Sequence, residues 1–420
     1  MKPSFAPFGL PIGISITLWT IIGFFRYLSE NLFRPKKRKY SRFGRSDIAA
    51  IIPAHDEEVV IRRCIQAVKQ SLNPSQIYVV SDGSSDKTYR RAQMEGCHVS
   101  YLIPGHGKGK ALVYLLKRYR LFENYKLIFI IDADTQIDKD CVKNALKLFS
   151  DPSVGTVFAT SQIRWKQHVI PKLSYYFIAY RDRLNRLLVY IFIYGQTWKY
   201  TNVNYVIPGF CTIYKSNILK QLEIDTPGLL IEDFNLAFQV HKKRLCKIGY
   251  TTSAIGWDQY PDNFFDYWKQ IRRWNIGFFQ TVKKNGIWPS FFWLALGLFS
   301  LEVFLNSIFM LFLPVVIAVL FLNTLPNITY PPLASFISLY DNFGPYRELN
   351  IKDIFIGAFL IDYLVTVIIG IVNKKPQFFF YGLFFFFMHI VVSAVLISAI
   401  IPGFFGKSEG RWVSPKRQKS

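Results

Sequence analysis

A short apolar run that ends in two acidic residues constrains the fold of this chain most strongly. Residues 127–131 read Leu-Ile-Phe-Ile-Ile, which is typical of a strand buried in a parallel sheet. Asp132 and Asp134 follow it directly. Open α/β sheets bind ligands at the carboxyl ends of their strands, so we expect both carboxylates at such a site. The pair alone is weak evidence, because acidic residues also end strands as solvated turns or helix caps.

The surrounding region alternates between short apolar runs and amphipathic segments. We expect strands at 48–52, 77–80 and 127–131, and helices at 58–70, 85–95 and 139–149. This alternation predicts βαβ units and a mainly parallel sheet.

Polar residues follow the first two predicted strands, as they follow the third. Pro53 and Glu57 come after the first strand, and Asp82 precedes Gly83 at the end of the second. Residues 105–110 read Gly-His-Gly-Lys-Gly-Lys, in which glycines let backbone N–H groups approach phosphate and lysines neutralise it. The sequence has neither a Walker loop nor a G-x-G-x-x-G fingerprint. Each loop alone would be an ordinary βα turn, but acidic ends on three strands together predict a shared site.

A second acidic pair and an aromatic helix follow further along the chain. Glu232 and Asp233 precede a predicted helix at 234–241, where they complement the helix dipole or supply a general base. Residues 270–274 read Gln-Ile-Arg-Arg-Trp and lie in a predicted amphipathic helix at about 264–282. Tryptophan and arginine suit a membrane surface, so one face of this helix is expected there while the other lines the site.

Long apolar runs near both ends predict membrane-spanning segments. The run at 8–28 is long enough to span a bilayer, and the basic run at 34–39 places the central region in the cytoplasm. A signal peptide is disfavoured, because the charge follows the run and no small-residue cleavage site is evident. Further apolar runs lie at 291–322, 354–372 and 378–401. The first could form one tilted helix or a hairpin of two, which leaves four or five spans open.

Charge and cysteine usage limit the partners. The 51 Lys and Arg exceed the 28 Asp and Glu, for a net charge of +23. Many of these cations flank apolar runs, which favours anionic lipid headgroups over nucleic acid as partners. The five cysteines lack a Cys-x-x-Cys spacing, which indicates reduced cytosolic thiols without a zinc site.

Seven motifs occur in order between Ala49 and Trp274. They are P-x-x-x-E, S-D-G-S-S-D, G-K-G-K-A-L, D-A-D, G-F-C-T-I-Y, E-D and Q-x-x-R-W. In this order they resemble the membrane-integrated inverting family 2 glycosyltransferases, which include synthases of cellulose, chitin, hyaluronan and poly-N-acetylglucosamine. The resemblance implies an α/β fold of the GT-A type, with a mainly parallel sheet flanked by transmembrane and interfacial helices.

The same resemblance implies six regions along the chain. They are an N-terminal transmembrane helix (1–33), a basic cytosolic linker (34–46), a GT-A catalytic domain (47–262), an interfacial helix (263–290), C-terminal transmembrane helices (291–403) and a basic tail (404–420).

The family's nucleotide-sugar and metal contacts carry over by motif. The positions implied to hold the nucleotide sugar are Pro53, Glu57, Asp82, Lys108 and Asp132. Asp134 is implied to bind Mg²⁺ or Mn²⁺, cations that suit carboxylate and phosphate oxygens. Family members often have a further aspartate where this chain has Ser81, which removes one possible contact with the base.

The catalytic and acceptor positions carry over in the same way. Asp233 matches the catalytic base, next to Glu232. The positions implied for the acceptor and diphosphate site are Gly209, Phe210, Glu232, Gln270, Arg273 and Trp274. A single in-line displacement at such a site inverts the anomeric centre of the sugar.

The resemblance implies an enzyme of the cell membrane with a cytosolic catalytic domain. We expect it to extend a polysaccharide from a UDP-sugar, with UDP-N-acetylglucosamine as the preferred donor. Polar residues in the apolar runs could line a polymer path or pair between helices; they are Glu302, Asn306, Asp362 and His389. Alternatives are a non-processive transferase with a lipid acceptor, and an inactive transport or scaffold protein. The expected partners are the donor, a glycan or lipid acceptor and membrane lipids, with no nucleic acid.

Overall fold

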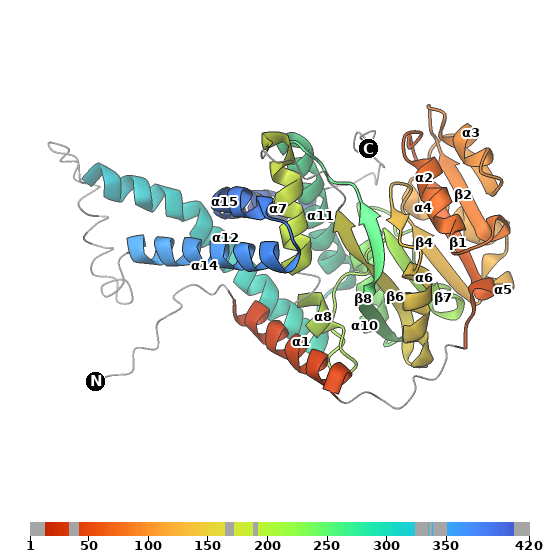
Figure 1. Cartoon of the computed structure of the whole chain (residues 1–420), viewed down its shortest axis with the longest axis horizontal. Helices are drawn as coiled ribbons and strands as arrows, with labels where there is room; N and C mark the ends of the chain where they lie inside the picture. Colours follow the sequence, from red (N-terminus) through yellow and green to blue (C-terminus); the bar gives the residue numbers. More distant parts are fainter. Residues whose placement is uncertain are drawn as a thin grey trace.

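The computed structural model describes residues 13–32, 42–163, 172–187, 192–323 and 351–406, together with Ser335 and Ser338. An α/β domain lies at one end of the molecule. The helices α12 (Phe291–Asn323) and α14 (Ile351–Val372) extend away from it toward the other end (Figure 1).

Among the described residues, eight strands form one sheet in the order β3-β2-β1-β4-β7-β6-β8-β5. The strands are β1 (Ile48–Ala54), β2 (Ile77–Asp82), β3 (His98–Leu102), β4 (Leu127–Ile131), β5 (Gln136–Ile137), β6 (Val154–Ile163), β7 (Cys211–Lys215) and β8 (Lys247–Asp258). Strands β3, β2, β1 and β4 run parallel, and so do β6 and β8. β7 is antiparallel to both β4 and β6, and β5 to β8. The expected mainly parallel sheet is confirmed, with β7 inserted in the opposite direction.

The central strands are buried on both faces, which explains their uninterrupted apolar sequences. Every residue of β1, β2 and β4 is buried, and alternate residues of β1 enter two separate cores. One core lies between the sheet and the helices α2 (Ile61–Lys69) and α6 (Cys141–Leu146). The other lies between the sheet and the helices α4 (Lys108–Arg118) and α10 (Glu232–Lys242).

The first two predicted helices begin later than expected, α2 at Ile61 and α3 (Thr88–Gln93) at Thr88. The residues before these helices form loops that bond to one another. The carboxylate of Asp56, for example, accepts the backbone N–H of Ser85 at 2.7 Å. Such side-chain bonds compete with the helical pattern and shorten both helices.

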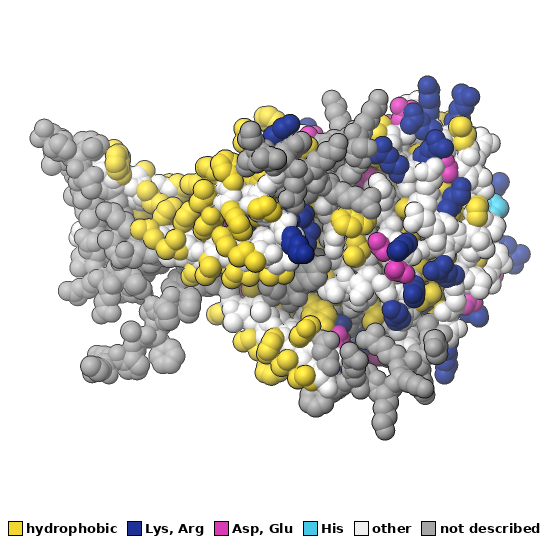
Figure 2. All heavy atoms as spheres, in the orientation of Figure 1, with side chains coloured by type: hydrophobic (Ala, Val, Ile, Leu, Met, Phe, Trp, Pro, Cys, Tyr) yellow, Lys and Arg dark blue, Asp and Glu magenta, His cyan; other side chains and the backbone are white. Residues whose placement is uncertain are grey.

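Three helices of the described part are long and apolar enough to cross a membrane. They are Phe291–Val319 in α12, Phe355–Val372 in α14 and Gln377–Phe405, which is α15. α12 is one continuous helix that passes through Pro314, so the hairpin alternative for this run is wrong. Hydrophobic side chains gather over the helical part of the molecule, whereas Lys and Arg are spread over the α/β domain (Figure 2).

The predicted N-terminal span corresponds in part to α1 (Ile14–Leu32), which is not one of these three helices. Residues 8–12 of that prediction lie outside the described residues, as do residue 33, residues 34–41 of the basic linker and residues 407–420 of the tail. α1 is attached to the catalytic domain through Arg26, which donates to the backbone carbonyl of Tyr194 at 2.7 Å.

Two further helices connect the sheet to the apolar helices. α7 (Tyr176–Leu187) and α11 (Phe264–Asn285) share a buried aromatic cluster with α15. At the other end of α15, a Cβ on Gly403 would lie 2.4 Å from Cβ of Phe279 in α11, so these helices approach very closely. The helix predicted to rest on the membrane surface is therefore also packed along a candidate span.

Candidate active site

The loop after β2 is tied to the glycine–lysine loop that precedes α4. Gly83 has φ of 65°, and a Cβ there would lie 2.6 Å from Cα of Gly105, so this close approach requires glycine. The carboxylate of Asp82 accepts backbone N–H bonds from His106 at 2.9 Å and Gly107 at 2.7 Å. The acid predicted to contact the nucleotide therefore also fixes the backbone of the neighbouring loop.

The remaining predicted nucleotide contacts lie at the same edge of the sheet. Pro53 is buried in β1, and Glu57 is buried in the loop that follows, where its backbone N–H donates to Oγ1 of Thr88 at 2.8 Å. Ser81, which stands where the family often has an aspartate, donates its hydroxyl to Oγ of Ser84 at 2.9 Å. Ser81 thus supports the turn after β2.

Lys108 joins the two acidic pairs that the sequence separates by a hundred residues. Its Nζ lies 2.8 Å from Oδ1 of Asp132 and 2.7 Å from Oε1 of Glu232. Burial alone would lower the pKa of Lys108, but Asp132, Glu232 and Asp233 outweigh it and raise that pKa well above its usual value. The lysine is therefore a fixed positive charge at the centre of the site.

A third acid that sequence reasoning missed lies beside Asp132 and Asp134. Asp258 ends β8 and accepts a hydrogen bond from Oγ1 of Thr135 at 3.1 Å. Burial, followed by the charge of Asp134, raises the pKa of Asp258 well above its usual value. Its position at a strand's carboxyl end is the same signal that marked Asp132, but the strand itself was not recognised.

The two acids of the Glu232–Asp233 pair titrate differently. Burial and the neighbouring Glu232 raise the pKa of Asp233 to about 7, against the opposing effects of Lys108 and the backbone N–H of Gly209. Burial would also raise the pKa of Glu232, but Lys108, its own backbone N–H and Arg273 bring that pKa below its usual value. Neighbouring acids with separated pKa values are typical of sites that transfer protons.

The predicted acceptor loop enters the site through its backbone. A Cβ on Gly209 would lie 2.5 Å from Oδ1 of Asp233 and 2.8 Å from Nζ of Lys108, so no side chain fits there. The carbonyl of Phe210 accepts the backbone N–H of Asp132 at 2.9 Å, while its ring packs against the core of the sheet. Gly209 therefore lies next to Asp233 and Lys108, whereas Phe210 holds the backbone of Asp132 and packs its ring into the core.

Helix α11 is fixed against the segment that leads into Glu232 and Asp233. The side-chain oxygen of Gln280 accepts the backbone N–H of Leu230 at 3.0 Å. A Cβ on Gly277 would lie 3.0 Å from the side chain of Ile231, so the helix approaches this segment closely. These contacts bring α11 close enough to the acidic pair for the charge of Arg273 to act on Glu232.

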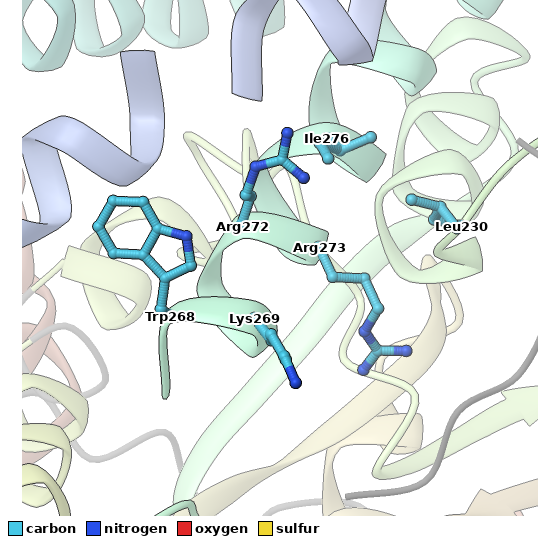
Figure 3. Close-up of a pocket in the computed structure, with 6 residues that line it drawn as sticks. All are labelled: Leu230, Trp268, Lys269, Arg272, Arg273 and Ile276. Atoms are coloured by element: carbon cyan, nitrogen blue, oxygen red, sulfur yellow. The ribbon is translucent and has the colours of Figure 1, made fainter. Parts of the chain in front are cut away.

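An open pocket of about 420 Å³ lies between this segment and α11. Its lining residues are Leu230, Trp268, Lys269, Arg272, Arg273 and Ile276 (Figure 3). Lys269 and Arg273 extend to the same side of α11, and Arg272 extends to the opposite side (Figure 3). Gln270 and Trp274 do not line this pocket, and Oε1 of Gln270 is buried without a hydrogen bond in the described part of the chain.

The acids around β4 fit a divalent cation that also binds phosphate. The described residues contain no group of three or more His, Cys, Asp or Glu side chains that could hold a metal ion by itself. Asp134 nevertheless acts electrostatically on both Asp132 and Asp258, which indicates three neighbouring carboxylates. Mg²⁺ is usually held by one or two carboxylates, waters and substrate phosphates, and this donor set matches that pattern.

Known proteins resemble this chain in sequence and in fold. The family model described as "Glycosyl transferase family 2" matches residues 49–222, which end before Asp233. The chain is 27% identical over 329 residues to the "Probable glycosyltransferase YdaM" of Bacillus subtilis, covering 70% of this chain and 76% of that protein. It is 23% identical over 289 residues to a poly-beta-1,6-N-acetyl-D-glucosamine synthase of Staphylococcus epidermidis, covering 66% of each. A Staphylococcus aureus synthase of the same name is 26% identical over 221 residues, half of each chain.

A solved structure shares the fold. The mannosyltransferase PcManGT from Pyrobaculum calidifontis, in complex with GDP-Man and Mn²⁺, matches with a TM-score of 0.52 and 16% identity over 94% of this chain and 99% of its own. The α/β domain thus has the GT-A fold. Residues 49–222 form a glycosyltransferase domain that matches the family 2 model.

Proposed function

We propose that this enzyme transfers N-acetylglucosamine from UDP-N-acetylglucosamine to a growing polysaccharide, with inversion, at the cytosolic face of the cell membrane. The observation that carries the proposal is the cluster in which Lys108 bridges Asp132 and Glu232 beside Asp233. Relatives named as poly-beta-1,6-N-acetyl-D-glucosamine synthases support the choice of sugar and product. The three candidate membrane helices support the membrane location.

Asp233 is the proposed general base that removes the proton of the acceptor hydroxyl. A pKa of about 7 suits this role, because the carboxylate is substantially ionised at neutral pH and still basic enough to take a proton. Gly209 has no side chain that would displace this carboxylate, since a Cβ there would lie 2.5 Å from Oδ1 of Asp233.

Lys108 and Arg273 are proposed to stabilise the diphosphate that leaves. Both are cations, and both act electrostatically on Glu232, so their charges reach the same region. Fixed positive charge that faces developing negative charge lowers the barrier to bond cleavage. Asp134, with Asp132 nearby, would hold a bound Mg²⁺ or Mn²⁺, which would supply further positive charge to the diphosphate.

Nucleotide recognition is proposed for the loops after β1 and β2. Pro53, Glu57 and Asp82 lie together at this edge, and Asp82 orders the backbone that leads to Lys108. Ser81 binds Ser84 within the loop, so base recognition would rely on the remaining residues. Gln270 and Trp274 are proposed to bound the acceptor side, with Phe210 as a supporting residue.

The test is a reaction of detergent-purified protein with a panel of UDP-sugars and Mg²⁺ or Mn²⁺, followed by sizing of the products. A ladder of N-acetylglucosamine oligomers is the expected result. A single addition to lipid would instead assign the enzyme to the non-processive class with a lipid acceptor. Absence of both transfer and donor hydrolysis with every sugar would contradict the proposal and favour a transport or scaffold role.

A further inference from the structure

Helix α7 presents an arginine to two aromatic rings at the edge of the site. The guanidinium carbon of Arg181 lies 4.8 Å from the ring centroid of Trp274 and 5.1 Å from that of Tyr260. Trp274 belongs to α11, and Tyr260 follows the end of β8. The Nε atom of Arg181 is buried without a hydrogen bond among the described residues. Contacts with aromatic rings therefore hold this side chain across the gap between two elements.

The next two residues of α7 attach the same helix to the apolar helices. Asp182 is buried and accepts contacts from Arg186 of α7 and from Lys375 in the turn between α14 and α15. Arg183 is also buried and pairs with Asp362 of α14. Breaking a buried ion pair is costly, so these contacts fix α7 firmly to the α14–α15 hairpin.

A fourth residue of α7 contacts the strand β6, near Asp258. The side-chain amide of Asn185 donates to Oγ of Ser161 in β6 at 3.0 Å. Ser161 in turn lies near the carboxylate of Asp258, on which the charge of Asp134 acts. Within two helical turns, α7 therefore has three kinds of contact. Arg181 contacts Trp274, and Asn185 contacts Ser161 near Asp258. Asp182 and Arg183 contact the α14–α15 hairpin.

We propose that Arg181 is a positioning residue that fixes the rings of Trp274 and Tyr260 as the acceptor-side wall, and that α7 links this wall to the α14–α15 hairpin. The inference rests on the proposed function, in which Trp274 bounds the acceptor. Without the guanidinium, the two rings lose the group that holds them together, while Lys108, Asp132 and Asp134 keep their contacts. Loss of Arg181 therefore weakens acceptor binding and leaves donor activation in place.

The experiment compares Arg181→Ala, Arg181→Met and Arg181→Lys in the full-length protein, with UDP-N-acetylglucosamine as donor and N-acetylglucosamine oligosaccharides as acceptors. For Arg181→Ala we expect the acceptor KM to rise roughly tenfold, with donor hydrolysis within about twofold of wild type. Arg181→Met should resemble Arg181→Ala, because it keeps length without charge. Arg181→Lys should recover most of the loss, because a lysine cation also binds an aromatic face.

The matched control is Arg118→Ala, which removes an exposed guanidinium 5.9 Å from the Tyr119 ring at the far end of α4. It should leave both kinetic constants unchanged. A double-mutant cycle with Trp274→Ala then tests whether Arg181 acts through Trp274. If it does, Arg181→Ala should change the acceptor KM by less than about twofold in the Trp274→Ala background.

Separate results would overturn the inference and the proposed function. Equal losses of donor hydrolysis and transfer in a folded Arg181→Lys variant would make Arg181 a general structural residue. Fully additive effects of Arg181→Ala and Trp274→Ala would show that Arg181 does not act through Trp274. A wild-type enzyme that transfers no sugar would overturn the proposed function itself, whereas wild-type activity with unaltered Arg181 variants would overturn this inference alone.

Discussion

Polar residues behave differently in the α/β domain and in the apolar helices. In the α/β domain, Lys108 bridges the partly exposed Asp132 and Glu232, and Lys269 and Arg273 line an open pocket. In the helices, polar groups contact one another. Oδ1 of Asp362 meets both Arg183 and Nε2 of His389, which lies 3.2 Å away.

Glu302 follows the same pattern in the helical part, because its carboxylate accepts the backbone N–H of Ser15 at the start of α1. Asn306 is an exception, since its Oδ1 is buried without a hydrogen bond in the described part. The same residue types therefore form the proposed catalytic cluster in one region and contacts between helices in the other. Sequence position alone left both roles open for the membrane residues.

The largest effect is expected from Asp233→Asn, which tests whether the open cluster is catalytic. The asparagine amide cannot take the proton of the acceptor hydroxyl. The rate of transfer should therefore fall by about 10³-fold, while the affinity for the donor stays unchanged. Isothermal titration with UDP and a transfer assay measure the two properties separately. Asp140→Asn, which alters an exposed acid before α6, is the control. Equal losses of donor affinity and transfer would remove Asp233 from the role of base.

Asp134→Ala should remove the dependence of donor binding on the divalent cation, with a loss of transfer of about 10²-fold or more. The reason is that Asp134 supplies a hard oxygen ligand next to Asp132 and Asp258. Titration of UDP binding against Mn²⁺ measures this directly. An unchanged Mn²⁺ titration in the variant would contradict the proposed metal site.

The sequence located the strand ends of the first half of the sheet well. β4 spans the predicted residues without error, because a strand buried on both faces is continuously apolar. β8 escaped prediction because its sequence, which contains Gly, Ser and Thr, neither alternates regularly nor stays apolar. Asp258 at its end was missed for that reason.

Helix α7 was missed for a different physical reason. Its charges at Arg181, Asp182 and Arg183 resemble a solvated face, yet two of these side chains are nearly fully buried. Their partners Lys375 and Asp362 lie 193 and 179 positions away in the sequence. A local pattern cannot distinguish a charge that meets water from one that meets a distant counter-charge.

Gly209→Ala should reduce transfer by about 10²-fold without unfolding the domain. The added methyl group would lie 2.5 Å from Oδ1 of Asp233 and 2.8 Å from Nζ of Lys108, so it displaces the base and the lysine together. Gly297→Ala in α12 is the control, because no atom lies within 4 Å of the added Cβ. If Gly209→Ala retained full activity, the exact positions of Asp233 and Lys108 would not determine the rate of transfer.

The rate of transfer should rise with pH through about 7. Asp233 accepts a proton only when ionised, and burial and Glu232 raise its pKa to about 7. Below that pKa, each unit of pH should lower the rate by about tenfold, and above it the rate should level off. A profile of kcat from pH 5.5 to 8.5 measures this. A flat profile across pH 6 to 8 would show that proton removal by Asp233 does not limit the rate.

The smallest effect is expected from Glu302→Gln, which tests the other side of the comparison. The amide oxygen can still accept the backbone N–H of Ser15, so the free energy of unfolding and the product length should change little. Glu302→Ala leaves that buried N–H without its partner and should cost about 1–3 kcal/mol of stability. Thermal unfolding in detergent and sizing of the product measure both. Shorter products from Glu302→Gln at unchanged stability would mean that this carboxylate contacts the glycan. The apolar helices would then bind the glycan product as well as pack against the α/β domain.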